Sequence, residues 1–156
     1  MTIRLKGGYD IFMVTIRPVT EVTKSLTDAY KVLIPQLSSS SNPPTEEALQ
    51  RIIESDSAQI LIAEDENGGI LGTMTLVIFQ IPTGIRAWIE DVVVDSSARG
   101  RGIGKKLNSA ALELAKQAGA KTVDLTSRPA RKEANQLYKD LGFIQRETNV
   151  YRFSFE

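Results

Sequence analysis

The sequence predicts an α/β fold in which one mixed sheet of about six to seven strands is flanked by four helices. Two observations support this prediction. Segments with strand-like and helix-like apolar spacing follow one another in the order β-α-α-β-β-β-α-β-α-β-β, without an internal repeat. The length of 156 residues and the hydrophobic share of 42% suit one compact domain with a substantial core. We therefore expect residues 1–13 to be an N-terminal extension and residues 14–156 to form a single domain.

The first part of the chain predicts one strand and two helices. Residues 14–17 are typical of a short strand, and residues 22–33 repeat apolar side chains at helical spacing until Pro35 ends the helix. Residues 38–44 are rich in serine and proline and form either a plain surface connection or a mobile flap over a substrate. Thr45 then caps the second helix.

The middle of the chain predicts a hairpin, a further strand and a long helix. Residues 60–63 and 70–79 are two strands, joined by the glycine-containing turn at residues 66–69. Residues 87–94 form the next strand. Apolar residues at helical spacing from residue 103 to residue 118 predict an amphipathic helix.

The last part of the chain predicts a strand, a helix and two final strands. Residues 122–126 are a short strand, and residues 131–141 are a helix with one apolar face. Residues 143–144 and 149–155 are typical of two final strands.

Composition excludes several kinds of chemistry. The 19 basic and 19 acidic residues balance, which argues against nucleic-acid and anionic-membrane partners. The chain has no cysteine and no histidine, so it offers no thiolate nucleophile and no imidazole base, and we expect no metal site. Proton transfer must then use Glu, Asp, Lys, Tyr, the chain terminus or water. No segment is typical of a signal peptide or a membrane span, and we expect a cytoplasmic protein.

The most informative segment is a glycine-rich turn between the strand at residues 87–94 and the long helix. It reads Arg99-Gly100-Arg101-Gly102-Ile103-Gly104, with Lys105 and Lys106 following. The first N–H groups of a helix lack partners, and glycines let them approach an anion. The turn therefore predicts a phosphate or pyrophosphate site. The alternative is a connection whose glycines merely allow tight packing. The spacing fits neither a Walker loop nor a Rossmann fingerprint.

The turn and later residues together resemble the GCN5-related N-acetyltransferases, the GNAT family. Residues 99–104 are similar to that family's pyrophosphate motif, Gln/Arg-x-x-Gly-x-Gly/Ala, and residues 90–95 to its central strand. Asn135 and Tyr138, followed by Gly142-Phe143, resemble its later helix and strand. The resemblance covers roughly residues 14–156 and implies the GNAT fold, with two central parallel strands that splay apart.

The resemblance implies acetyl-CoA as co-substrate. The backbone of Val92 and Val94 would bind the pantetheine arm as an added strand. A bulge would direct an N–H near Val92 or Val93 at the thioester carbonyl. The implied cofactor-binding residues are Val92, Val93, Val94, Arg99, Gly100, Arg101, Gly102, Ile103, Gly104, Lys105, Asn135 and Tyr138.

Two side chains are implied in catalysis. Tyr138 is the expected general acid that protonates the departing CoA thiolate, although its place on an apolar helix face also suits a core tyrosine. Glu90 is the expected base for the ammonium of the acceptor, acting mainly through water. Strand alternation would place Glu90 on the same face as Val92 and Val94. It would leave Asp91 on the other face, as a buried, hydrogen-bonded carboxylate.

These observations predict an acetyl-CoA-dependent N-acetyltransferase acting on a primary amine of a small molecule or peptide, by direct attack in a ternary complex. The acceptor itself cannot be read, although residues 89–91 are also similar to glucosamine-phosphate acetyltransferases. Two rivals stay open: a CoA-binding sensor or regulatory module without turnover, and a nucleotide-phosphate binder outside the family. The family also raises the expectation of a homodimer.

Overall fold

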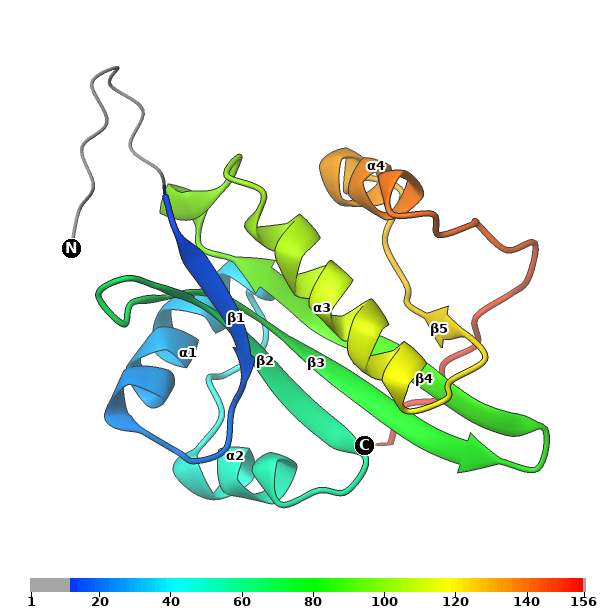
Figure 1. The fold of residues 1–156 in the computed structure, drawn as a ribbon, viewed down its shortest axis with the longest axis horizontal. Helices are drawn as coiled ribbons and strands as arrows, with labels where there is room; N and C mark the ends of the chain where they lie inside the picture. Colours follow the sequence, from blue (N-terminus) through cyan, green and yellow to red (C-terminus); the bar gives the residue numbers. More distant parts are fainter. Residues whose placement is uncertain (1–11, 156) are drawn as a thin grey trace. The chain divides into compact units, whose positions relative to one another are not determined.

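The computed structural model describes residues 12–155, and the chain divides into two compact units, Met1–Thr126 and Ser127–Glu156. Each unit is described by itself. The N-terminal extension predicted at residues 1–13 lies largely outside the described residues and stays a prediction. The strands are β1 (Val14–Pro18), β2 (Ala58–Asp65), β3 (Ile70–Ile81), β4 (Gly84–Val94) and β5 (Val123–Asp124), and the helices are α1 (Lys24–Leu37), α2 (Glu46–Ile53), α3 (Ile103–Gln117) and α4 (Lys132–Asp140) (Figure 1).

The first unit is built on one mixed sheet. Its strands lie in the order β1-β2-β3-β4-β5, with antiparallel pairs from β1 to β4 and a parallel pair between β4 and β5. The parallel pair is confined to Ala87 opposite Val123 and Trp88 opposite Asp124. Beyond Trp88, β4 continues to Val94 while β5 has already ended. The predicted mixed α/β fold with four helices is confirmed.

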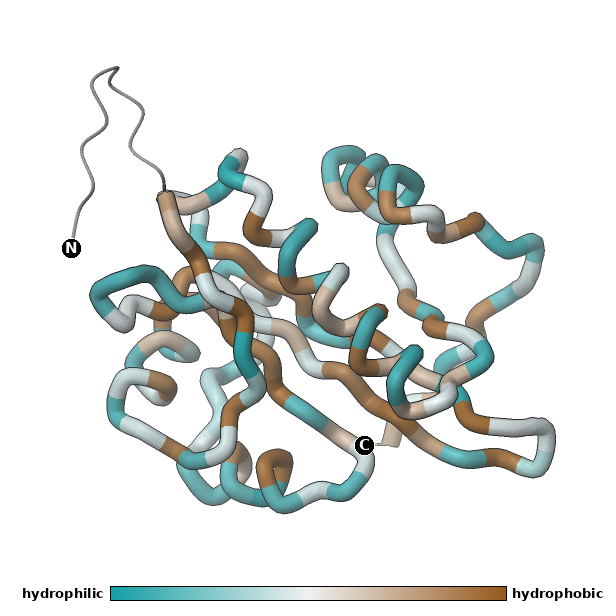
Figure 2. The backbone as a smooth tube through the Cα atoms, viewed as in Figure 1, coloured by the Kyte–Doolittle hydropathy of each residue, from teal (hydrophilic) through white to brown (hydrophobic). Residues whose placement is uncertain are grey.

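The helices of the first unit cover both faces of the sheet. A side chain at Gly72 of β3 would meet Leu107 and Ile103 of α3. The next residue, Thr73, bonds to Tyr30 of α1. Because successive side chains of a strand point to opposite faces, α3 covers one face and α1 covers the other. Hydrophobic segments run along the central strands in Figure 2.

Two predicted strands near the C-terminus are absent from the structure. The five-stranded sheet is therefore smaller than the six to seven strands expected. Residues 143–144 and 149–155 have no strand conformation, and most of their large apolar side chains are exposed, as in Phe153 at 82% and Phe155 at 91%. Alternating apolar residues indicate a strand only where a neighbouring strand accepts its backbone bonds. Within residues 127–155 the structure holds one helix and no strand.

Local turn and cap signals predict the element boundaries better than proline does. Thr45 caps α2 as expected, accepting from the backbone N–H of Ala48 at 3.2 Å. The prediction that Pro35 ends α1 is wrong, because the helix runs on to Leu37. A proline in the last turn removes one donor, but the backbone N–H of Ser38 still bonds to the carbonyl of Ile34 at 2.9 Å.

Candidate functional site

The strand β4 contains a bulge in its C-terminal half. Val93 pairs with Thr73 and Glu90 pairs with Thr75, so that two residues of β4 lie opposite one residue of β3. Asp91, one of the two, has a φ of +53°, which non-glycine residues rarely adopt. The strand thus departs from regular pairing at the position where the sequence resemblance implied a bulge.

The bulge changes which side chains share a face. Directly opposed residues of an antiparallel pair point to the same side, so Glu90 and Val93 share the α1 face with Thr75 and Thr73. Val94 therefore lies on the opposite face. The expectation that Glu90, Val92 and Val94 form one face by simple alternation is wrong, because the extra residue shifts the alternation by one position.

Glu90 is held in place by a neighbour on its own strand. The indole Nε1–H of Trp88 donates to Oε1 of Glu90 at 2.7 Å. Glu90 is otherwise exposed. One oxygen of its carboxylate is thereby oriented, and the side chain still reaches solvent.

Asp91 lies next to this carboxylate but is not the buried residue that alternation predicts. It is exposed as a residue. Partial burial of its carboxyl group, together with the charge of Glu90, raises the pKa of Asp91 above its ordinary value. The charge of Asp91 also contributes to the raised pKa of Tyr30, whose main cause is burial. The two adjacent carboxylates thus lie in the C-terminal half of β4, with Asp91 near Tyr30 of α1.

The segment after β4 is ordered by side chains from two elements. Asp95 accepts from the backbone N–H of Ser97 at 2.8 Å and from its hydroxyl at 2.6 Å, which lowers the pKa of Asp95. Gln36 of α1 accepts from the backbone N–H of Ser96 at 2.8 Å. These bonds hold the short 3₁₀ turn Ser96–Ala98 that leads into the glycine-rich turn.

The glycine-rich turn needs glycine for its backbone conformation. Gly100 and Gly102 have φ values of +75° and +76°, which glycine adopts without strain. A Cβ at either position would meet no atom within 4 Å. The alternative that these glycines allow tight packing is therefore not supported. They leave open space where α3 begins.

The first turn of α3 is open to an anion. Gly102 is its N-cap, no side chain caps it, and its first turn contains no acidic residue. The exposed Lys105 and Lys106 lie there instead. Cations at the positive end of a helix are unfavourable unless an anion is bound. This arrangement fits a phosphate or pyrophosphate group.

The two arginines of the turn have partners within the protein. Nε of Arg99 donates to the carbonyl of Val94 at 3.2 Å. The guanidinium group of Arg101 lies 4.5 Å from the ring centre of Phe12. Both guanidinium groups are thus kept beside the start of α3, where they add positive charge.

Sequence reasoning missed one residue of α3. Asn108 is fully buried, and its Oδ1 has no hydrogen-bond partner in the part of the chain that the structure describes. The available signal was a single amide within the buried stripe that Ile103, Leu107 and Ala111 form. A buried amide with an unused acceptor indicates a missing donor.

Asn135 and Tyr138 lie on α4, in the second unit. Nδ2 of Asn135 donates to the carbonyls of Arg128 and Arg131, both at 2.8 Å, and so holds the start of the helix. Tyr138 is buried, with its ring in edge contact with Phe143 at 5.8 Å. Burial raises the pKa of the Tyr138 phenol, an effect that the charge of Arg131 reduces. The phenol therefore keeps its proton at neutral pH.

Two further observations concern residues 12–155 as a whole. No group of three or more acidic, histidine or cysteine side chains there is placed to hold a metal ion. None of the helices described has both the length and the apolar character needed to cross a membrane.

Comparison with known proteins identifies relatives of this chain. The family model described as "Acetyltransferase (GNAT) family" matches residues 24–143. A probable glucosamine 6-phosphate N-acetyltransferase 2 from Oryza sativa subsp. japonica is 37% identical over 97 residues, which span 58% of this chain and 57% of that protein. Glucosamine 6-phosphate N-acetyltransferase 1 from the same organism is 33% identical over 127 residues, or 76% of this chain and 74% of that protein.

A solved structure has a similar fold. The crystal structure of glucosamine-6-phosphate N-acetyltransferase from Arabidopsis thaliana superposes with a TM-score of 0.73, at 25% identity, over 90% of this chain and 98% of that one. The chain described here belongs to the acetyltransferase (GNAT) family.

Proposed function

We propose that this GNAT family member is an acetyl-CoA-dependent N-acetyltransferase that modifies a primary amine by direct attack in a ternary complex. The observation that carries this proposal is the chain segment that leads from the bulged strand β4 through the glycine-rich turn to the uncapped start of α3. It offers unpaired backbone groups for an extended arm, followed by an anion site for phosphates. The absence of cysteine from the sequence supports a mechanism without a thiol-bound acyl group.

The residues around the turn suit the cofactor. Backbone groups of residues 92–94 would bind the pantetheine arm, and residues 99–105 would bind the pyrophosphate. The open space at Gly100 and Gly102 leaves room for the phosphates. When bound, acetyl-CoA supplies an acetyl group already activated as a thioester.

Glu90 would prepare the acceptor. An ammonium group must lose a proton before its nitrogen can attack, and the Glu90 carboxylate receives that proton directly or through water. The bond from Trp88 keeps one oxygen in a constant position. A backbone N–H at the bulge, near Val92 or Val93, would stabilise the negative charge that develops on the carbonyl oxygen.

Tyr138 would complete the proton balance. As the new carbon–nitrogen bond forms, the carbon–sulfur bond breaks and the sulfur takes the phenolic proton. The raised pKa of Tyr138 means that this proton is present at neutral pH. The attacking nitrogen then loses its second proton, which returns to the Tyr138 phenolate directly or through water. The first proton passes from Glu90 to solvent, so the enzyme ends unchanged and one proton is released.

An amino sugar phosphate is the first acceptor to test, because two curated relatives carry the name glucosamine 6-phosphate N-acetyltransferase. The experiment measures CoA release with a panel of amines: glucosamine 6-phosphate, unphosphorylated glucosamine, an aminoglycoside, a polyamine and a lysine peptide. We expect turnover with glucosamine 6-phosphate above the other amines. Turnover with another amine alone would overturn the acceptor. Acetyl-CoA binding without turnover of any amine would favour the CoA-binding sensor module instead.

A further inference from the structure

Asn108 has a buried carbonyl group whose bonding capacity is unused. The residue is 0% exposed, and its Nδ2 donates to the carbonyl of Gly104, one turn earlier, at 2.8 Å. Its Oδ1 is buried and has no donor among the described residues. Leaving a buried acceptor unpaired costs stability, so a leucine of the same branching would be preferred on packing grounds alone.

A second buried polar side chain of the same unit behaves differently. Thr73 is 2% exposed, and its hydroxyl donates to the carbonyl of Leu61 at 3.1 Å and contacts the hydroxyl of Tyr30 at 3.1 Å. Both capacities of that hydroxyl are used within the protein. Within the first unit, the buried Thr73 hydroxyl is therefore satisfied, whereas Oδ1 of Asn108 is not.

Asn108 lies close to the proposed phosphate site along α3. A helix rises about 1.5 Å per residue, which places Asn108 roughly 7.5 Å along the axis from Ile103, the first residue of α3. Helical side chains lean toward the N-terminus, and the bond to Gly104 fixes this one in the same direction. The unused Oδ1 thus lies between one and two turns from the start of α3.

Because Oδ1 is a hydrogen-bond acceptor, it can bind only a donor group of a ligand. An amide oxygen accepts hydrogen bonds and cannot donate them, and the phosphates also offer only acceptors. The partner must carry an N–H or O–H group. Along acetyl-CoA, the first such groups after the pyrophosphate on the thioester side are the hydroxyl and the first amide N–H of the pantetheine arm.

We infer that Oδ1 of Asn108 accepts a hydrogen bond from the pantetheine arm of acetyl-CoA and so positions the arm between the phosphate site and the bulge of β4. The inference rests on the proposed function. It makes Asn108 a cofactor-binding residue specific to the arm. The buried acceptor is then a cost in the ligand-free protein that cofactor binding removes.

The test uses Asn108→Leu, which keeps the branching of the side chain and removes both polar atoms. Calorimetry measures binding of acetyl-CoA and of 3′-phospho-ADP, which has the pyrophosphate and lacks the arm. We expect the dissociation constant for acetyl-CoA to rise about tenfold and that for 3′-phospho-ADP to stay the same. The melting temperature of the ligand-free protein should rise by about 2–4 °C, because a buried unpaired group is gone.

Thr73→Val is the matched control, since it removes a buried polar atom whose bonds are made within the protein. Its melting temperature should fall. If Asn108→Leu melts lower than the wild type and binds acetyl-CoA equally well, Asn108 is structural or bonds to a buried water, and the inference is overturned. Should the leucine variant fail to fold, Asn108→Ala gives the same ratio of the two affinities.

The outcome separates the inference from the function on which it rests. Wild-type protein that binds acetyl-CoA normally, with an Asn108 variant of equal affinity, overturns the inference alone. Wild-type protein that binds neither acetyl-CoA nor 3′-phospho-ADP overturns both.

Discussion

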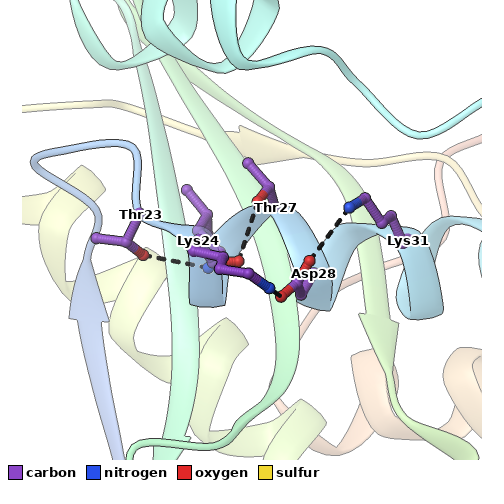
Figure 3. A network of polar contacts seen from close by, with 6 residues as sticks. Thr23, Lys24, Thr27, Asp28 and Lys31 are labelled. Carbon is purple, nitrogen blue, oxygen red and sulfur yellow. Dashed lines mark hydrogen bonds and ion pairs between the residues drawn. The ribbon is translucent and has the colours of Figure 1, made fainter.

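Helices α1 and α3 begin in opposite ways. At α1, the Thr23 hydroxyl accepts from the backbone N–H of Leu26 at 3.2 Å, and Asp28 pairs with both Lys24 and Lys31 (Figure 3). The positive charge of Lys24 in the first turn is thus balanced one turn later. These two lysines hold the pKa of Asp28 below its ordinary value.

At α3, the first turn has neither a side-chain cap nor a carboxylate that balances its lysines. Gly102 has no side chain to cap the helix, and the first turn contains no carboxylate. Lys105 and Lys106 are exposed at the positive end, where each cation costs about 0.3–1 kcal/mol. The start of α1 is capped and its first-turn charge is balanced by its own side chains, whereas the start of α3 has no side-chain cap and no carboxylate in its first turn.

The largest expected effect comes from making α3 begin with a carboxylate. Gly102→Asp places a negative charge where the phosphates would lie, and acetyl-CoA affinity should fall at least about 100-fold. Gly102→Asn is the matched variant, because asparagine also tolerates positive φ and carries no charge. Calorimetry should show a much smaller loss for the asparagine variant. Equal losses in the two variants would mean that backbone conformation, and not charge, limits binding.

The next effect separates cofactor binding from chemistry. Tyr138→Phe removes one hydroxyl and keeps the ring that contacts Phe143. If α3 binds acetyl-CoA and Tyr138 supplies the proton, kcat should fall about 100-fold, a much larger loss than any loss of acetyl-CoA affinity. Steady-state kinetics with calorimetry measures both quantities. An unchanged kcat would leave Tyr138 as a core residue only.

Glu90→Gln should have a smaller effect. The glutamine oxygen can still accept from the Trp88 indole, so the local geometry is kept while the base is lost. We expect kcat/KM for the acceptor to fall about tenfold, since a water-mediated base is partly replaceable by solvent. The measurement is the initial rate at varied acceptor concentration. A normal kcat/KM across the pH range would remove Glu90 from the mechanism.

The smallest effect tests the α1 side of the comparison. Thr23→Ala removes the cap of α1 and should lower the free energy of unfolding by about 1 kcal/mol. Chemical denaturation measures this loss. Acetyl-CoA affinity should not change, because Thr23 caps α1 and is not among the residues proposed to bind the cofactor. A loss of cofactor affinity in this variant would contradict the distinction between the two helix starts.

Local sequence signals predict much of this fold. The turn at residues 66–69 follows from Asp65, which accepts from the backbone N–H of Asn67 and of Gly69, each at 2.8 Å. The start of α2 follows from Thr45, and the glycine-rich turn follows from glycines that adopt positive φ. Each of these signals acts between residues a few positions apart, so the sequence contains the whole interaction.

Other features depend on segments that are distant in the sequence. The bulge of β4 is set by its register with β3, and that register decides that Glu90 shares a face with Val93 instead of Val94. The absent strands at residues 143–144 and 149–155 show the same limit, because alternation cannot supply a partner.

The sequence by itself determined the family, the mixed α/β architecture and the position of the glycine-rich turn before α3. These depend on short-range patterns of glycine, charge and apolar spacing. Only the tertiary structure decided to which face of the sheet each residue around the bulge points. It also decided that Asp91 is exposed and that Oδ1 of Asn108 has no hydrogen-bond partner among the described residues. Those properties depend on which backbone and side-chain groups from other elements come within hydrogen-bonding distance. A short-range sequence pattern does not predict which groups these are.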